Sequence, residues 1–295
     1  MYLKGSIVAL VTPFLNGEID WDSLENLIEL HLKSGTNAIL AAGTTGEAAV
    51  MTESEYKKVI SFIAEKTEGK IPVLAGTGLN DTQATIRRTK IAADSGANYA
   101  LTVTPYYNKP GHQGLLAHYT TIADESPIPV VLYNVPSRTG INMQPKTVLE
   151  LAEHPNIRGI KEASGNVGQA AEILSEAPKG FNLYSGDDKI NYPLMTMGAA
   201  GAISVVANIV PSFFAKSMHL FEEQKYNEAR EMYFKLLKLS EVLFIETNPA
   251  PAKAALHLAG VIKSLELRLP LTTLSEASLE VLSEALNELK TQNIL

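Results

Sequence analysis

Eight short apolar runs recur along the first three quarters of the chain, and a helical pattern follows each of them. The runs are rich in Val, Ile, Leu or Ala, which is typical of strands buried on both faces of a parallel sheet. One helical segment opens with Thr52 and Glu55 in capping-box spacing. Eight strand–helix units in a row indicate an α/β fold, the (β/α)8 or TIM barrel. The predicted strands are Ile7–Val11, Ala38–Ala41, Pro72–Ala75, Tyr99–Val103, Pro129–Tyr133, Ile157–Lys161, Phe181–Tyr184 and Ala202–Val206.

From residue 225 onward no strand-like run follows, and the pattern becomes purely helical. Prolines separate the helical segments, as suits helix starts and stops. We therefore expect a catalytic barrel over residues 1–224 and a C-terminal helical extension over residues 225–295. The predicted helices of the extension are Asn227–Ile245, Pro251–Ser264 and Ser275–Lys290.

Composition excludes several classes of protein. The chain has 295 residues, no cysteine, and 25 basic against 32 acidic side chains, for a net charge of -7. The lack of cysteine excludes a disulfide scaffold, a thiolate metal site and a cysteine nucleophile. The acidic balance argues against nucleic acid or an anionic membrane as a partner, because both need clustered Lys and Arg. Prolines, glycines and asparagines interrupt the longest uncharged stretch, Ile190–Ala215, and no secretory signal is evident, so we expect a cytoplasmic protein.

Lys161 is a charged residue inside the sixth apolar run. Period-two alternation places it on one face with Ile157, Gly159 and Ala163. If that face points into the barrel, desolvation lowers the pKa of the ammonium and produces a nucleophilic amine suited to a Schiff base. The alternative is a lysine paired with a carboxylate of a neighbouring strand. Tyr133 ends the adjacent strand, where its phenol either passes protons to the amine or is a core tyrosine with a satisfied hydroxyl.

Three further loops follow strand ends, where barrels carry their catalytic groups. Residues 43–46 read Gly-Thr-Thr-Gly, which offers backbone N–H groups and two hydroxyls to a small anion, or is a plain turn. Arg138 either clamps a carboxylate bidentately or is a solvated surface residue. Tyr106 and Tyr107 are consecutive, so if one packs down the other projects outward, which indicates a contact with another subunit.

Other kinds of site lack the necessary spacing. The six histidines show no metal-ligand pattern, and residues 76–81 imitate a dinucleotide loop without its third glycine. Asp187 and Asp188 follow the seventh run, but no partner cluster is visible, so we interpret them as surface or loop-end carboxylates. The sequence therefore predicts no metal site.

Seven motifs occur in order along the chain. They are Gly43-Thr44-Thr45-Gly46-Glu47, Pro105-Tyr106-Tyr107-Asn108-Lys109-Pro110, Tyr133-Asn134-Val135-Pro136-Ser137-Arg138-Thr139-Gly140, Gly159-Ile160-Lys161-Glu162-Ala163, Ser185-Gly186-Asp187-Asp188, Gly201-Ala202-Ile203-Ser204-Val205 and Glu246-Thr247-Asn248-Pro249. Together they resemble the dihydrodipicolinate synthase family of the pyruvate-dependent class I aldolases, over essentially the whole chain.

The resemblance implies a reaction. Pyruvate condenses on Lys161 to a Schiff base and then an enamine, which attacks the aldehyde of L-aspartate-4-semialdehyde. The product cyclises on release to 4-hydroxy-tetrahydrodipicolinate, in the first committed step toward diaminopimelate and lysine. Tyr133, Thr45 and Tyr107 would form the proton relay, with Tyr107 supplied by a partner subunit. The family usually assembles as a homotetramer, a dimer of tight dimers, and the resemblance implies no metal or organic cofactor.

The resemblance also implies how the substrates are held. The pyruvate carboxylate would meet the loop of Thr44 and Thr45, and Arg138 would hold the carboxylate of the semialdehyde. Backbone groups of Gly186 and Ile203 would line the pocket near the lysine.

A regulatory site departs from the family pattern. Lysine-inhibited members carry two histidines and a glutamate where this chain has Glu53, Tyr56 and Ala84. Because no carboxylate stands at the glutamate position to hold the ammonium group of lysine, we expect weak or absent inhibition by lysine. The remaining positions assigned to this site are Ala49, Asn80 and Tyr106.

Two alternatives stay open. N-acetylneuraminate lyase and 2-keto-3-deoxy sugar-acid aldolases share the lysine and the tyrosine, although Arg138 in its loop favours the synthase. An alternative of another class is a non-catalytic barrel that only binds a keto acid, which the intact Lys161, Tyr133 and Thr45 disfavour.

Overall fold

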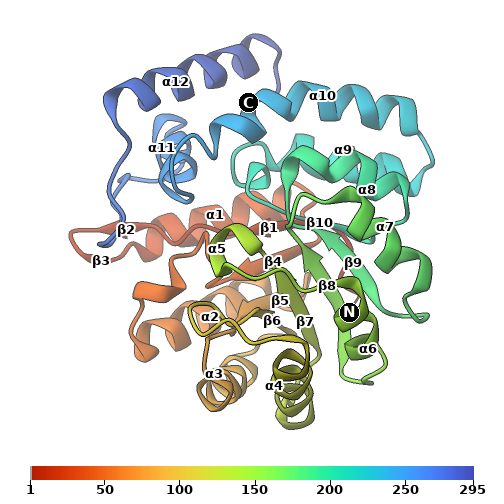
Figure 1. Ribbon diagram of the computed structural model, residues 1–295. Helices are drawn as coiled ribbons and strands as arrows, with labels where there is room; N and C mark the ends of the chain where they lie inside the picture. The colour runs from red at the N-terminus through yellow and green to blue at the C-terminus, as the bar shows by residue number, and fades with distance from the viewer. Residues whose placement is uncertain (1) are drawn as a thin grey trace.

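The eight apolar runs form a closed barrel of parallel strands, as predicted (Figure 1). The computed structural model describes residues 2–295. Each barrel strand pairs with its neighbour in sequence, and β10 pairs with β1 to close the barrel. The strands are β1 (Gly5–Ala9), β4 (Ala38–Ala41), β5 (Val73–Gly76), β6 (Tyr99–Val103), β7 (Val130–Asn134), β8 (Ile157–Glu162), β9 (Asn182–Ser185) and β10 (Gly201–Ser204).

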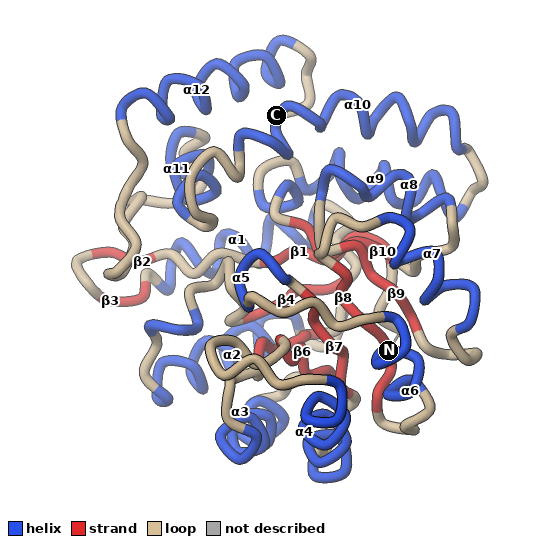
Figure 2. Tube along the Cα trace, in the orientation of Figure 1, coloured by secondary structure: helices blue, strands red, loops and turns tan. Residues whose placement is uncertain are grey.

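Helices surround the barrel in a ring (Figure 2). Successive ring helices from α1 to α8 contact one another, and α9 packs against α1. The predicted capping box is present: Glu55 N donates to Thr52 Oγ1 at 3.2 Å, and Thr52 N donates to Glu55 Oε2 at 2.9 Å. The ring helices are α1 (Trp21–Lys33), α2 (Glu53–Thr67), α3 (Thr82–Asp94), α4 (His112–Glu125), α6 (Pro145–Ala152), α7 (Val167–Glu176), α8 (Asn191–Thr196) and α9 (Pro211–Glu222).

A small hairpin that the sequence analysis did not predict follows β1. Its strands are β2 (Phe14–Leu15) and β3 (Glu18–Ile19), which pair antiparallel. Asn16 and Gly17 form the turn with φ angles of 55° and 83°. Asn-Gly favours such a turn because both residues tolerate positive φ, so a signal for the hairpin was present in the sequence.

The C-terminal extension packs against the barrel on one side (Figure 1). It contains α10 (Tyr226–Val242), α11 (Ala250–Leu258) and α12 (Glu276–Thr291). The predicted helices match these three, except that the second was expected to reach Ser264 and ends at Leu258. One apolar cluster contains side chains of all three helices together with side chains of α1, α2 and α9. The division of the chain at residue 224 stays a prediction.

The stretch Ile190–Ala215, which is free of charged residues, does not form one helix. It is divided among α8, β10, the 3-10 helix η3 (Val206–Asn208) and the start of α9. Within residues 2–295, no helix combines the length and the apolarity that crossing a bilayer requires.

Apolar side chains fill the barrel interior. They include Ile7, Leu40, Leu74, Leu101, Val131, Tyr133, Tyr184 and Ile203. Lys161 stands in register between Tyr133 on β7 and Tyr184 on β9, so it shares their inward face. The prediction that Ile157 shares this face is wrong, because the β7–β8 register shifts at Val130/Val131. This register shift breaks the in–out alternation of side chains along β8, so Ile157 points outward and packs in the apolar cluster between the barrel and the helices.

Candidate active site

A cavity of about 580 Å³ lies where the predicted strand ends converge. Six of the predicted site residues line it, and they come from four separate motifs of the chain. They are Thr44, Thr45, Tyr133, Arg138, Lys161 and Gly186. Ile203 is buried in the barrel interior but is not among the residues that line the cavity.

Lys161 is the buried amine at the base of this site, with 6% of its surface exposed. Burial lowers its pKa to about 8; the charge of Asp188 opposes this effect and that of Arg138 adds to it. Its Nζ lies 4.5 Å from the centre of the Tyr133 ring. Gly186 leaves room for the side chain, because a Cβ there would lie 2.9 Å from Lys161 Cγ.

Tyr133 brings a phenol to the amine. Burial raises the pKa of this phenol, whereas the charge of Arg138 and a hydrogen bond with the Thr44 side chain lower it. Thr45 is differently engaged, because its Oγ1 accepts a hydrogen bond of 2.9 Å from Asn248 Nδ2. The hydroxyl in contact with Tyr133 is therefore that of Thr44, not that of Thr45, to which the resemblance gave the relay role.

Arg138 lies in the short helix α5 (Pro136–Thr139), directly after β7. Its Nη2 donates to the carbonyl oxygen of Asn248 at 3.2 Å, and the residue remains exposed at the cavity. Asn248 thus contacts both Arg138 and Thr45. Sequence reasoning gave Asn248 no role, although its Glu-Thr-Asn-Pro motif was recognised.

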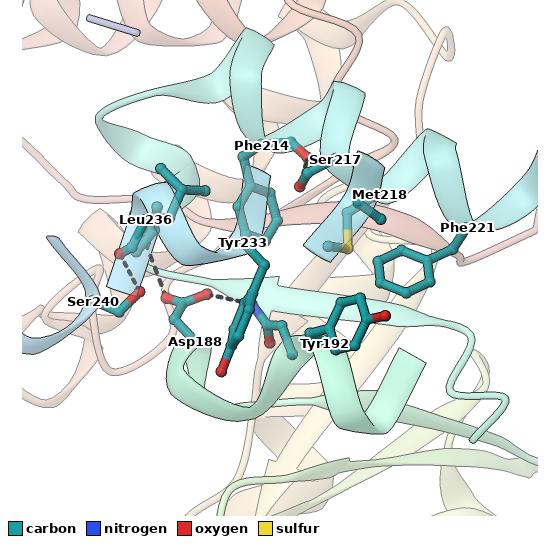
Figure 3. Close-up of a pocket in the computed structure, with 12 residues that line it drawn as sticks. Asp188, Tyr192, Phe214, Ser217, Met218, Phe221, Tyr233, Leu236 and Ser240 are labelled. Carbon is teal, nitrogen blue, oxygen red and sulfur yellow. Dashed lines mark hydrogen bonds between the residues drawn. The ribbon is translucent and has the colours of Figure 1, made fainter. Parts of the chain in front are cut away.

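Asp188 corrects one sequence prediction. It is buried rather than a surface carboxylate, and it accepts hydrogen bonds from Val205 N at 2.9 Å, Val206 N at 3.0 Å and Asn191 Nδ2 at 2.9 Å. Figure 3 shows its carboxylate beside a small internal cavity, near Tyr233. Burial raises the pKa of this carboxyl, and its negative charge raises the pKa of the barrel lysine. Neither the strand periodicity nor the motif around Asp188 could reveal that it is buried, because its burial depends on backbone N–H groups in the loop after β10.

Tyr107 projects into solvent from the loop after β6, with 89% of its surface exposed and a φ of 71°. Tyr106 instead lines a second cavity of about 300 Å³, beside Tyr133 and Arg138. Tyr106 is nevertheless 37% exposed, so neither tyrosine is packed into the core, and only the outward projection of Tyr107 agrees with the expectation. Within this single chain Tyr107 does not line the site.

The positions assigned to regulation lie around two neighbouring cavities. Glu53, Tyr56 and Ala84 line one of about 180 Å³. Ala49 and Tyr106 line the second cavity described above. Asn80 lines neither and accepts a hydrogen bond of 2.8 Å from Asn108 Nδ2 through its carbonyl oxygen.

Arg88 lies between these two cavities and lines both. Its guanidinium carbon is 4.1 Å from the centre of the Tyr56 ring, and its Nη2 donates to Ala48 O at 3.0 Å. The guanidinium of Arg88, held by these two contacts, therefore lies among the residues assigned to regulation.

Metal ligation has no support in residues 2–295, where no group of three or more His, Asp or Glu side chains is placed to hold an ion.

A buried lysine of lowered pKa, with a phenol beside it at the strand ends of a TIM barrel, is typical of the class I aldolases. The comparisons with known proteins agree. The model of the Dihydrodipicolinate synthetase family matches residues 2–289, so the chain belongs to this family. The resemblance seen in the sequence is confirmed.

Individual relatives cover almost the whole chain. A 4-hydroxy-tetrahydrodipicolinate synthase of Geotalea uraniireducens is 48% identical over 275 residues, 93% of this chain and 94% of the relative. A chloride-inhibited dihydrodipicolinate synthase of Acinetobacter baumannii, solved with pyruvate, is 44% identical with a TM-score of 0.96 over 100% of both chains. The synthase of Cyanidioschyzon merolae, solved with lysine bound, is 40% identical with a TM-score of 0.93 over 97% of this chain and 97% of that one.

Replacing Asp188 with Asn should move the pKa of Lys161 below about 8, because the carboxylate charge that raises this pKa is lost. The variant is nearly isosteric, and the unpartnered Oδ1 of Asn191 is available to accept from the new amide after a flip of its own side chain. Competitive labelling with acetic anhydride across pH, read at Lys161 by mass spectrometry, measures the pKa. A matched Asp187→Asn change should leave it in place. An unchanged or higher value in the Asp188→Asn variant would contradict the assigned electrostatics.

Proposed function

We propose that the chain condenses pyruvate with L-aspartate-4-semialdehyde through a Schiff base on Lys161. The product is 4-hydroxy-tetrahydrodipicolinate, the first committed intermediate toward diaminopimelate and lysine. The observation that carries the proposal is the buried Lys161 amine, whose pKa is lowered to about 8 beside the Tyr133 ring. The names of the curated relatives and the pyruvate in the Acinetobacter baumannii complex support it. The proposal includes a cytoplasmic location, which follows from the biosynthetic step and from no feature of the fold.

The lowered pKa gives Lys161 the protonation state that the first step needs. With a pKa of about 8, roughly one amine in ten is neutral at pH 7, against about one in three thousand at an ordinary lysine pKa. The neutral amine attacks the ketone carbon of pyruvate to form a carbinolamine. Loss of the hydroxyl as water then leaves the imine.

Proton transfers are assigned to Tyr133 and its hydrogen-bonded neighbour Thr44. The phenol delivers a proton to the departing hydroxyl, and removal of a proton from the pyruvate methyl group converts the imine to the enamine. We assign this relay position to Thr44, because the Thr44 side chain is hydrogen-bonded to the Tyr133 phenol, whereas the Thr45 hydroxyl accepts from Asn248. Thr45 would then help to bind the pyruvate carboxylate, together with the backbone of the loop that contains both threonines.

The second substrate is placed by Arg138, which meets its carboxylate at the exposed side of the cavity. The enamine carbon attacks the aldehyde, and the aldehyde oxygen becomes a hydroxyl. The amino group of the added segment then attacks the imine carbon, closes the ring and releases Lys161 as the free amine. Backbone groups of Gly186 and Ile203 are proposed to frame the pocket during these steps.

Tyr107 is proposed to complete the relay of a partner subunit in a homotetramer built from tight dimers. Its exposure of 89% makes it available to a second copy, and its loop adjoins Tyr106 at the neighbouring cavity. In this arrangement each active site depends on two chains.

Pyruvate and borohydride should give a reduced adduct on Lys161, because borohydride traps an imine as a stable secondary amine. Peptide mass spectrometry locates the adduct. The Lys161→Arg variant keeps a long cationic side chain but should give none. A wild-type chain without the adduct, or with it on another lysine, would refute the mechanism. Cleavage of N-acetylneuraminate without condensation of the semialdehyde would instead favour the sialic acid lyase alternative.

Two inactive variants should restore activity when they share a dimer. In a hybrid of Tyr107→Phe and Lys161→Arg chains, one of the two sites has an intact lysine and an intact partner tyrosine. Random pairing should therefore recover about a quarter of wild-type activity after co-expression. The coupled condensation assay measures the recovery. Activity no higher than the mean of the two separate variants would contradict the shared site.

Lysine should inhibit weakly or not at all. Ala84 supplies no carboxylate to hold an ammonium group, and the Arg88 guanidinium over the Tyr56 ring repels a second cation at these positions. Initial rates at increasing lysine should stay near the uninhibited rate through the micromolar range, and an Ala84→Glu change should increase the sensitivity. Inhibition of the wild-type chain by micromolar lysine would contradict this expectation.

A further inference from the structure

Glu47 is a buried carboxylate at the end of the loop that carries Thr44 and Thr45. Its side chain is 1% exposed, and both of its oxygens accept hydrogen bonds. Oε1 accepts from Lys253 Nζ at 2.5 Å, and Oε2 accepts from Arg268 N at 3.1 Å. Both donors belong to the C-terminal extension, so the loop is joined to a segment more than 200 residues away.

Lys253 is fully buried on α11 and has no contact with solvent. Besides Glu47, its Nζ donates to Glu266 O at 2.7 Å and lies 4.2 Å from the centre of the Phe14 ring. The ammonium is thus held between the extension and the β2–β3 hairpin. These contacts fix the position of the ammonium group and of the Glu47 carboxylate that it faces.

Arg268 connects the same region to α2. Its guanidinium donates to both carboxylate oxygens of Glu55, at 2.9 Å and 2.5 Å, and to Gly17 O at 2.9 Å. Its ring contact is again Phe14, 4.4 Å from the guanidinium carbon. The loop end, the hairpin and α2 are therefore fixed to one another through residues of the extension.

The backbone passes any movement of Glu47 directly to the threonines. Glu47 N donates to Thr44 O at 3.1 Å, and Ala48 N donates to Gly43 O at 3.3 Å, so the loop is one tight turn. Glu47 itself has a left-handed φ of 56°, which is unfavourable for a non-glycine residue and persists only where the surroundings hold it. The two donors of the extension supply that restraint.

A buried ion pair is a weak source of stability. Desolvation of the two charges offsets their attraction, and a well-packed hydrophobic pair of similar volume is often as stable or more so. The fully buried Glu47–Lys253 pair is therefore better explained by geometry than by stability, since it holds one side chain of the loop at one place relative to the barrel.

We propose that Glu47 and Lys253 are positioning residues, through which the C-terminal extension holds the Thr44–Thr45 loop where pyruvate binds beside Lys161. The inference rests on the proposed function of that loop. A second contact of the extension, from Asn248 to Thr45, acts on the same loop. The extension is thus a structural part of the pyruvate site.

Paired substitutions test the proposal without leaving a lone buried charge. Glu47→Leu with Lys253→Met removes the pair and both hydrogen bonds to the loop. Glu47→Gln with Lys253→Met also removes both charges but keeps an acceptor for Arg268 N. The matched control is Lys238→Met, which breaks an exposed ion pair with Glu288 within the extension.

The readout is kcat/KM for each substrate, measured separately, with the melting temperature as a check on folding. In a two-step Schiff-base mechanism, kcat/KM for pyruvate reports imine formation, and kcat/KM for the semialdehyde reports the later condensation. Loss of folded enzyme lowers both by the same factor. We expect the Leu/Met pair to lower kcat/KM for pyruvate about tenfold to a hundredfold. The value for the semialdehyde should change less than about threefold, since Arg138 stays in place.

The Glu47→Gln/Lys253→Met variant should have a higher kcat/KM for pyruvate than the Leu/Met variant, though below that of the wild type. The Lys238→Met control should leave kcat/KM for both substrates unchanged. Equal reductions for the two substrates, or no reduction in a folded Leu/Met variant, would overturn the proposal. If the Leu/Met variant does not fold, the Gln/Met variant decides: a loss confined to pyruvate supports the proposal, and wild-type values overturn it. Failure of the wild-type chain to form the Lys161 adduct would refute the proposed function instead, so the two failures are distinguishable.

Discussion

The burial of one amine in the barrel interior is the constraint on which the site depends. Side chains fill the interior of a closed parallel barrel, so a lysine there loses most of its hydration and its pKa falls. Lys161 occupies a position that apolar side chains fill on the neighbouring strands. Gly186 leaves the space its side chain needs, and the charge of Asp188 limits the fall in pKa. The packing that makes the barrel stable therefore also makes the amine reactive.

Pyruvate and the protein carry net charge of the same sign, and the semialdehyde also presents a carboxylate. With a net charge of -7, the chain as a whole does not attract a keto acid, so local donors must do so. Arg138, the two loop hydroxyls and backbone N–H groups provide them within one cavity. The loop can present its donors only if its backbone is fixed, and the ties from the extension to Glu47 and Thr45 give that fixation.

Sequence periodicity predicted the barrel well, because strands buried on both faces leave a continuous apolar signature. All eight strands begin and end within two residues of the predicted runs. The failures have particular causes. Ile157 changes face at a register shift, and Asp188 is buried by backbone N–H groups of another loop. Which threonine meets Tyr133 depends on the rotation of two adjacent residues, which a motif does not encode.

The sequence by itself determined the fold class, the lysine and its family, because periodicity and ordered motifs are local properties of the chain. Only the tertiary structure decided which groups act on that lysine. Asn248, Lys253 and Arg268 reach the loop of Thr44 from far along the chain, and their distance in sequence conceals a contact of a few ångströms. The electrostatic environment of a buried charge is likewise a sum over neighbours that come together only when the barrel closes.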